Sequence, residues 1–149
     1  MTFIKKRENN TIFDIVVVGA GPVGIAFACG FGDTNIKIAI IDKLPKAAIS
    51  SPKIDGREIA LTHNSVKILK KLKVWHHISN KSKSVIKEAR ILDGNSTYFL
   101  NFNHLEIQKA NLGYLIPNHV IKKNLYKELK KHSNITLINK TECISINAD

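Results

Sequence analysis

Two short apolar runs stand near the start of the chain, at residues 12–18 (IFDIVVV) and 36–41 (IKIAII). Both are rich in β-branched side chains, as strands buried on both faces require. Residues 22–31 between them can form a helix, because a proline is tolerated in a first helical turn and the glycines at positions 30 and 32 can mark its end. Two strands around a short helix predict a parallel βαβ unit, which is right-handed in nearly all sheets.

Two longer helices are predicted further along the chain. Residues 43–57 contain two prolines and a glycine and are expected to form a loop. Residues 62–73 and 118–131 then show helical periodicity, with apolar side chains on one face and lysines opposite. The positions on the expected buried faces are Leu61, Ser65, Ile68, Leu69 and Leu72 for the first helix and Ile121, Leu125 and Leu129 for the second.

An antiparallel insertion is expected between these two helices. Residues 85–92 and 97–102 flank Asp93-Gly94-Asn95, a strong hairpin signal, and Tyr98, Phe99 and Phe102 are expected to pack the inserted sheet. Residues 113–117 form a further extended piece. Residues 135–138 and 143–146 are expected to close the chain as strands.

These elements predict an α/β fold with a Rossmann-like βαβ core, an inserted antiparallel strand segment and an incomplete sheet. We expect residues 1–11 to be a polar N-terminal tail. Residues 12–149 form the nucleotide-binding part, with the inserted strands at about 85–117. A dinucleotide-binding sheet usually has more strands, so the sequence is expected to be the N-terminal part of a longer domain.

The chain of 149 residues carries a net charge of +11. Its cations are nearly all lysines, with arginines only at Arg7, Arg57 and Arg90. Bidentate phosphate recognition favours arginine, so this balance does not favour nucleic-acid binding, whereas peripheral contact with an anionic bilayer stays open. The lysine clusters at 70–73, 122–123 and 130–131 fall on helical patterns and are expected to be solvated.

No apolar run approaches the roughly 20 residues of a membrane-spanning helix, and the charged N-terminus lacks the apolar core of a signal peptide. Cys29 and Cys143 lie far apart in sequence, without the spacing of a metal or redox site. We interpret them as buried thiols in a reducing compartment. We therefore expect a cytoplasmic protein, with contact at the inner face of the membrane left open. The pair His76-His77 has no third ligand nearby in sequence, and no metal site is expected.

The strongest motif is Gly19-Ala20-Gly21-Pro22-Val23-Gly24, which follows the first strand and opens the first helix. In such a turn the first glycine permits the tight bend, the second admits a pyrophosphate to the backbone, and the third lets helix and strand pack closely. The pyrophosphate then lies at the positive helix N-terminus. Asp42 ends the second strand, where a carboxylate can accept hydrogen bonds from the hydroxyl groups of a ribose. Its negative charge disfavours a 2′-phosphate. The motif thus predicts FAD or NAD rather than NADP.

Two further segments resemble a known family. Residues 55–61 (DGREIAL), followed by Ser65, Leu69 and Trp75, are similar to the second signature of the ubiquinone-biosynthesis hydroxylases. These enzymes belong to the FAD-dependent aromatic-ring monooxygenases of the para-hydroxybenzoate-hydroxylase class. Residues 112–121 (LGYLIPNHVI) resemble their third N-terminal signature. With the glycine turn, three segments in the family's order cover residues 12–130.

The resemblance implies FAD as the cofactor, held by the glycine turn, Asp42, Lys43, Arg57 and Asn118. Asp42 stands where the class usually has glutamate. Arg57 would reach the FAD from the loop after the second strand, and the alternative is a surface ion pair. Asn118 would lie beside the ribityl chain, and the alternative is an ordinary helix N-cap.

The resemblance also implies a function, which is that of the N-terminal FAD-binding portion of a monooxygenase hydroxylating a polyprenylated phenol in ubiquinone biosynthesis. NAD(P)H is the expected reductant, and the flavin rather than a protein acid or base supplies the chemistry, so no catalytic residue is named. Only the family's first third is matched. The sequence leaves open an inactive or split-gene fragment, with a separate polypeptide carrying the rest, and a stand-alone NAD-binding module.

Overall fold

A computed structural model describes residues 12–146, and its first sheet contains three parallel strands. They are β1 (Ile15–Val18), β2 (Ile38–Asp42) and β8 (Ile135–Asn139), in the order β1-β2-β8. Ile15 pairs with Ile38, and Ile38 with Ile135. Read from β8 to β1, this is the 3-2-1 order of the first half of a doubly wound dinucleotide-binding sheet. The predicted βαβ unit and the α/β class are confirmed.

Helices cover one face of this sheet. α1 (Pro22–Cys29) and α2 (Lys46–Ser50) both pack against α4 (Asn118–Leu129). The largest of the fully buried side chains lie at these contacts and around the second sheet, and they are Ile25, Ile38, Ile40, Ile49, Val74, Ile116 and Leu125. Each such aliphatic side chain contributes about 1.5–3 kcal/mol relative to an exposed one. Packing of this kind fixes the carboxyl ends of the strands against the start of α1.

The other face of β1 is bare among the described residues. Val16 and Val18 are 54% and 55% exposed, so the prediction of a strand buried on both faces is correct for β2 and wrong for β1. An apolar sequence shows that both faces of a strand can be buried, but not that another element covers them. No described element covers this face of β1.

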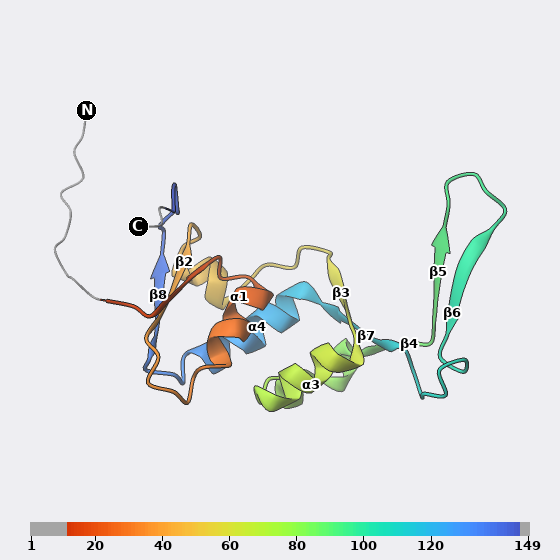
Figure 1. Cartoon of the computed structure of the whole chain (residues 1–149), viewed down its shortest axis with the longest axis horizontal. Coiled ribbons are helices and arrows are strands. Elements are labelled where there is room, and N and C mark those ends of the chain that lie inside the picture. The colour runs from red at the N-terminus through yellow and green to blue at the C-terminus, as the bar shows by residue number, and fades with distance from the viewer. Residues whose placement is uncertain (1–11, 147–149) are drawn as a thin grey trace.

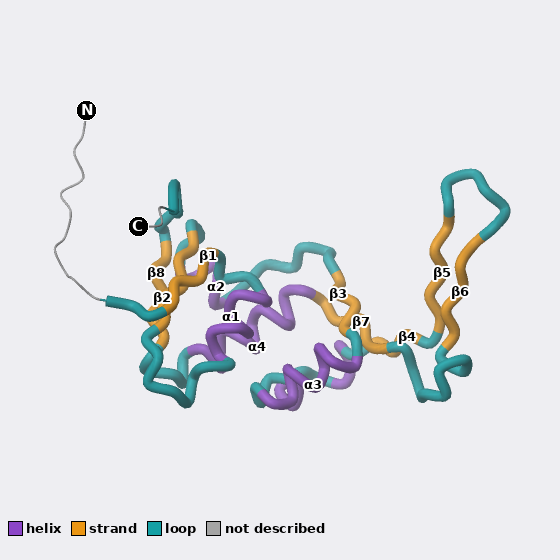
Figure 2. Tube along the Cα trace, in the orientation of Figure 1, coloured by secondary structure: helices purple, strands orange, loops and turns teal. Residues whose placement is uncertain are grey.

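A second, antiparallel sheet lies beyond the helices (Figure 2). Its strands are β3 (Glu58–Leu61), β7 (Gly113–Pro117) and β4 (Ser84–Ile86), in the order β3-β7-β4. α3 (His63–Lys71) follows β3, and Thr62 caps it by accepting a hydrogen bond from the Ser65 amide at 3.3 Å. Two short 3₁₀ turns, η1 (Trp75–His77) and η2 (Asn80–Ser82), lead from α3 to β4. The Trp75 ring meets the Tyr114 ring edge-on at 5.1 Å.

A two-stranded hairpin, β5 (Glu88–Leu92) and β6 (Phe99–Asn103), projects from the end of the molecule opposite the parallel sheet (Figure 1). Tyr98, Phe99 and Phe102 are 85%, 51% and 45% exposed, so the expectation that they pack the inserted sheet is wrong for the described residues. An isolated hairpin is at best marginally stable in water. Its apolar side chains therefore form a surface suited to a further contact.

Several expected boundaries need correction. The expected loop at 43–57 contains α2, because Ile49 is buried against the core and draws a short Ala-rich segment into a helical turn. β3 was not expected at all, since its residues are mostly exposed and show no alternation. The strand expected at 85–92 breaks at Lys87, where the chain passes from one sheet to another. Residues 143–146 form no strand, because they pair with nothing described.

The face expected for α3 is also partly wrong. Val66 and Leu69 are buried, whereas Ile68 is largely exposed. β1, α1, β2 and α4 agree with the expected elements to within three residues at each end. The lysine clusters at 70–73, 122–123 and 130–131 are mostly exposed, as expected. Cys29 is buried, but Cys143 is only partly so, and both thiols are free.

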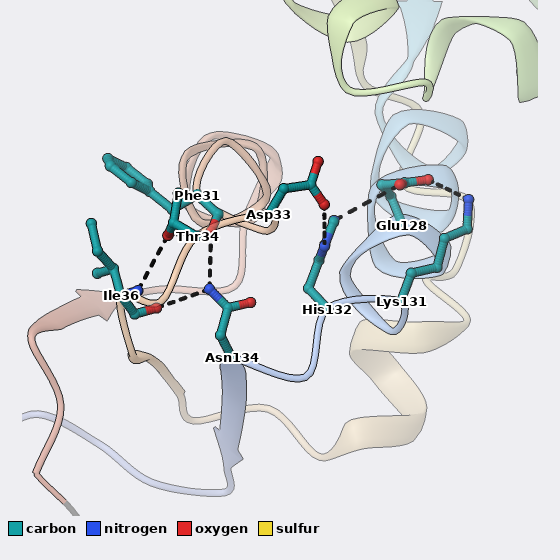
Figure 3. Close-up of polar contacts among 8 residues, drawn as sticks. All are labelled: Phe31, Asp33, Thr34, Ile36, Glu128, Lys131, His132 and Asn134. Atoms are coloured by element: carbon teal, nitrogen blue, oxygen red, sulfur yellow. Dashed lines mark hydrogen bonds and ion pairs between the residues drawn. The ribbon is translucent and has the colours of Figure 1, made fainter.

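A polar network fixes the turn between α1 and β2 against the end of α4 (Figure 3). The Asn134 side-chain amide donates to the Phe31 and Ile36 carbonyls at 2.9 and 2.8 Å. Buried Glu128 pairs with Lys131 at 2.6 Å and lies 3.8 Å from the His132 ring. Hydrogen bonds between uncharged groups each contribute about 0.5–1.5 kcal/mol, and those to charged groups contribute about 1.5–3 kcal/mol.

The expected tail at 1–11 lies outside the described residues, as do residues 147–149. Within 12–146, no helix combines the length and the apolar character that crossing a bilayer requires.

Candidate functional site

The glycine turn lies directly between the end of β1 and the start of α1. Gly19 has a φ of +106°, which side-chain-bearing residues rarely adopt, and its amide donates to the Ile41 carbonyl of β2 at 2.8 Å. A Cβ on Gly24 would collide with the Gly19 carbonyl oxygen. Both positions therefore require glycine for the helix to begin this close to the strand.

The N-terminus of α1 is open. Gly21 is its N-cap, Pro22 occupies the first turn, and no described side chain caps the helix. A Cβ on Gly21 would meet no atom within 4 Å. Free backbone N–H groups at a helix N-terminus attract an anion, by about 0.3–1 kcal/mol at an exposed site and up to about 2 kcal/mol when partly buried. The turn thus leaves room for a phosphate at its positive end.

Asp42 links the end of β2 to the glycine turn. Its Oδ2 accepts the Ala20 amide at 2.7 Å, and its Oδ1 accepts the Leu44 amide at 2.7 Å. Each carboxylate oxygen retains capacity for another hydrogen bond. The residue therefore shapes the turn and can also accept hydroxyl groups from a ligand.

A hollow of about 330 Å³ lies at the carboxyl ends of the parallel strands. Gly19, Asp42 and Lys43 line it from one side, and residues 141–143 line it from the other. The sequence pattern gives Thr141, Glu142 and Cys143 no role in nucleotide binding. Their position directly after the third parallel strand was the available signal, because ligands bind outside the carboxyl ends of such strands.

A second polar cluster joins Asp55, Arg57 and Asn118. The Asp55 Oδ2 atom accepts hydrogen bonds from Arg57 Nε at 2.9 Å, from Arg57 Nη2 at 2.6 Å and from Asn118 Nδ2 at 2.8 Å. The backbone N–H of Asn118 also donates to the backbone carbonyl of Arg57 at 2.9 Å. The side chains of Asp55 and Asn118, 63 residues apart in sequence, are thus brought together where β3 begins and β7 ends.

This cluster changes the interpretation of both predicted residues. Asn118 is not the N-cap of α4, since Pro117 has that position and Asn118 is the first helical residue. Arg57 does form an ion pair, with Asp55, and its side chain stays 69% exposed. Asp55 is part of the DGREIAL segment, but the sequence pattern alone gives it no role. An acid two residues before an arginine is too common a pattern to indicate a pair.

The hydrogen bonds of the cluster stabilise the charged form of Asp55. The Asn118 amide and then the Arg57 guanidinium lower the pKa of Asp55 from 3.8 to about 2. The carboxylate is consequently ionised throughout the physiological range.

An apolar hollow of about 330 Å³ lies between the start of α1 and the segment β3–α3. Pro22 and Val23 of the glycine turn line it together with residues 59–61 of β3. Arg57 lies two residues before this wall.

The residues present fit a dinucleotide. An open helix N-terminus suits a pyrophosphate, the neighbouring Asp42 suits a ribose, and Arg57 and Asn118 add donors and an acceptor further along. Within residues 12–146, no three side chains of the types that ligate metals gather into a site, and His76 and His77 are both exposed.

Comparison with known proteins agrees with this geometry. A family model described as FAD binding domain matches residues 13–149. The ubiquinone hydroxylase UbiM of Neisseria meningitidis is 36% identical over 132 residues, covering 86% of this chain and 29% of that protein. The mitochondrial ubiquinone biosynthesis monooxygenase COQ6 of Dictyostelium discoideum is 26% identical, covering 94% of this chain and 31% of that protein.

Solved structures show the same fold. The p-nitrophenol 4-monooxygenase PnpA of Pseudomonas putida matches 93% of this chain and 34% of its own, with a TM-score of 0.66 at 19% identity. PqsL of Pseudomonas aeruginosa, described as a probable FAD-dependent monooxygenase, matches 92% of this chain and 35% of its own, with a TM-score of 0.65 at 13% identity. This chain thus spans about a third of the proteins that it matches. The chain belongs to the family of FAD-binding domains, it is homologous to the ubiquinone-biosynthesis hydroxylases, and its cofactor is FAD.

Proposed function

We propose that this chain is the FAD-binding portion of a monooxygenase that hydroxylates a polyprenylated phenol in ubiquinone biosynthesis, with NAD(P)H as reductant. The observation that carries the proposal is the combination, on one chain, of an open glycine turn and the similarity of most of its length to ubiquinone hydroxylases. The activity, the reductant and the substrate belong to the whole protein, of which this chain corresponds to less than a third.

We assign each part of the FAD to residues of this chain. Asp42 accepts hydrogen bonds from the hydroxyl groups of the adenosine ribose, and Lys43 lines the same hollow. The backbone from Gly19 to Gly24 and the start of α1 hold the pyrophosphate. Arg57 and Asn118 lie toward the ribityl chain and the flavin.

When bound and reduced, the flavin supplies the oxygen chemistry of the hydroxylation. The residues of this chain bind and orient it. Asp42 disfavours a 2′-phosphate by charge, so this nucleotide site rejects NADP. We assign none of residues 12–146 the role of catalytic acid, base or nucleophile.

We further propose that a separate polypeptide carries the remainder of the enzyme. The bare face of β1 and the hairpin β5–β6 expose apolar side chains that a partner could cover, including Val16, Val18, Tyr98 and Phe99. Exposed apolar patches of this kind commonly mark contact sites.

Peripheral contact with the membrane belongs to the same proposal. The substrate class is membrane-resident, and the net charge of +11 favours an anionic surface by about 1 kcal/mol per lysine near it. Sedimentation with vesicles containing phosphatidylglycerol tests this contact. Association is expected at low salt and should be lost at high salt, and binding that salt does not change would contradict the electrostatic account.

The activity is tested with the full chain, FAD, NADH or NADPH, and a short-chain polyprenylated phenol, with product identified by mass spectrometry. The reaction is run with the chain alone and with a polypeptide corresponding to the remaining two thirds of UbiM. Addition of one oxygen atom to the phenol in the second reaction supports the proposal. FAD binding without any hydroxylated product in either reaction would indicate an inactive fragment.

A further inference from the structure

Asp55 has a hydrogen-bonding arrangement that a surface ion pair does not need. Its Oδ2 atom alone accepts two bonds from the Arg57 guanidinium and one from the Asn118 amide, at 2.6–2.9 Å. Its Oδ1 accepts the Arg57 backbone amide at 3.2 Å. One carboxylate thereby fixes both residues that the proposed function places beside the flavin half of FAD.

The carboxylate determines which way the Asn118 amide points. An asparagine side chain can present either its NH2 group or its oxygen, and only the NH2 group can donate to a carboxylate. The Asn118 NH2 group is used by Asp55, whereas no hydrogen bond among the described residues uses its Oδ1. That oxygen is also not among the side-chain atoms that are fully buried without a partner. The Asn118 oxygen is therefore an acceptor without a partner among the described residues, in a side chain that is only 4% exposed.

The carboxylate also determines which edge of Arg57 is available. Asp55 binds the guanidinium through Nε and Nη2, so Nη1 and its two N–H groups face away from the pair. With its charge balanced by Asp55, Arg57 contributes directional hydrogen bonds rather than a free cation. Such an edge suits an acceptor atom on the flavin half of the ligand.

We propose that Asp55 is a positioning residue for FAD, which orients the Asn118 oxygen toward a hydroxyl group of the ribityl chain and the free Arg57 edge toward the flavin. This inference rests on the proposed assignment of Arg57 and Asn118 to the cofactor. It predicts that Asp55 affects the affinity for FAD and not that for ADP, because ADP lacks the ribityl chain and contacts mainly the glycine turn and Asp42.

The test measures the affinities of FAD and ADP for the full chain by titration calorimetry. Asp55→Asn keeps the shape of the side chain but removes the charge that orients both partners. We expect FAD affinity to fall about tenfold, while ADP affinity stays within about twofold. Asp93→Asn is the matched control, because Asp93 is an exposed aspartate that also precedes a glycine, and neither affinity should change.

A double-variant cycle separates positioning from a structural role. In an Arg57→Ala/Asn118→Ala background, Asp55→Asn should reduce FAD affinity by less than about twofold, because nothing remains for it to position. An equal loss in both backgrounds, or a parallel loss of FAD and ADP affinity with a lowered Tm, would show that Asp55 only holds the loop together. Unchanged FAD affinity in Asp55→Asn would also overturn the inference. A wild-type chain that binds ADP but gains nothing from the flavin half would instead refute the proposed roles of Arg57 and Asn118.

Discussion

Replacing Gly21 by alanine tests whether the open helix N-terminus is the phosphate site. Gly21 has a φ of −75° and a ψ of 177°, which alanine adopts without strain, and a Cβ there would meet no protein atom within 4 Å. The methyl group would therefore fit the protein but occupy the space assigned to the pyrophosphate.

The two effects of Gly21→Ala differ in size. Alanine is a poorer N-cap than glycine, by about 1 kcal/mol, but it also restricts the unfolded chain, which recovers about 0.4–1 kcal/mol. The Tm should thus stay within about 3 °C of the wild type. Displacing the pyrophosphate from one backbone N–H group costs about 1.5–3 kcal/mol, which is about a 10- to 150-fold loss of FAD affinity.

Calorimetric titration with FAD and a thermal melt of the same sample measure both effects. Gly24→Ala is the comparison variant, because its Cβ collides with the Gly19 carbonyl oxygen and should lower the Tm as well as the affinity. If Gly21→Ala bound FAD within twofold of the wild type, the open space at this turn would not be where the phosphate lies.

Three further predictions concern packing, reactivity and pH. Leu125→Ala should destabilise the chain by about 2–5 kcal/mol in denaturant titrations, because Leu125 is fully buried between helix and sheet, whereas the exposed Val23→Ala should cost less than about 0.5 kcal/mol. Iodoacetamide should modify Cys143 long before Cys29, since burial and then Glu128 raise the pKa of Cys29 to about 12; equal labelling by mass spectrometry would contradict this. The Tm difference between wild type and Asp55→Asn should be constant from pH 8 to 5 and shrink as the pH falls from about 4 to about 2, because the pKa of Asp55 is lowered on folding and its contribution is lost on protonation; a difference that already shrinks near pH 6 would contradict this.

The nucleotide-binding core could be predicted because its chemistry is local. Between Ile15 and Asp42 the chain forms a strand, a glycine turn, a helix and a second strand. Each of these elements is encoded in residues that are neighbours in sequence. Exposure could not be predicted in the same way. The residues of β1 have the composition of a buried strand, yet whether Val16 and Val18 are covered depends on elements distant in sequence.

The second half of the site shows the same limit. The family resemblance pointed to Arg57 and Asn118, but their shared partner Asp55 appears only when β3 pairs with β7. Likewise, residues 141–143 reach the first hollow only because β8 is the third parallel strand. Contacts between segments some 60–120 residues apart follow from the sheet topology, which periodicity within a single segment does not reveal.

We propose that the glycine turn of this chain binds the adenosine diphosphate half of FAD. The most direct test is a calorimetric titration of the purified full chain with FAD, repeated in the presence of ADP and of FMN. The structure predicts saturable one-to-one binding that ADP displaces at a lower concentration than FMN, which lacks the adenosine half. Displacement by FMN but not by ADP, or an absence of saturable FAD binding by a correctly folded chain, would contradict the claim.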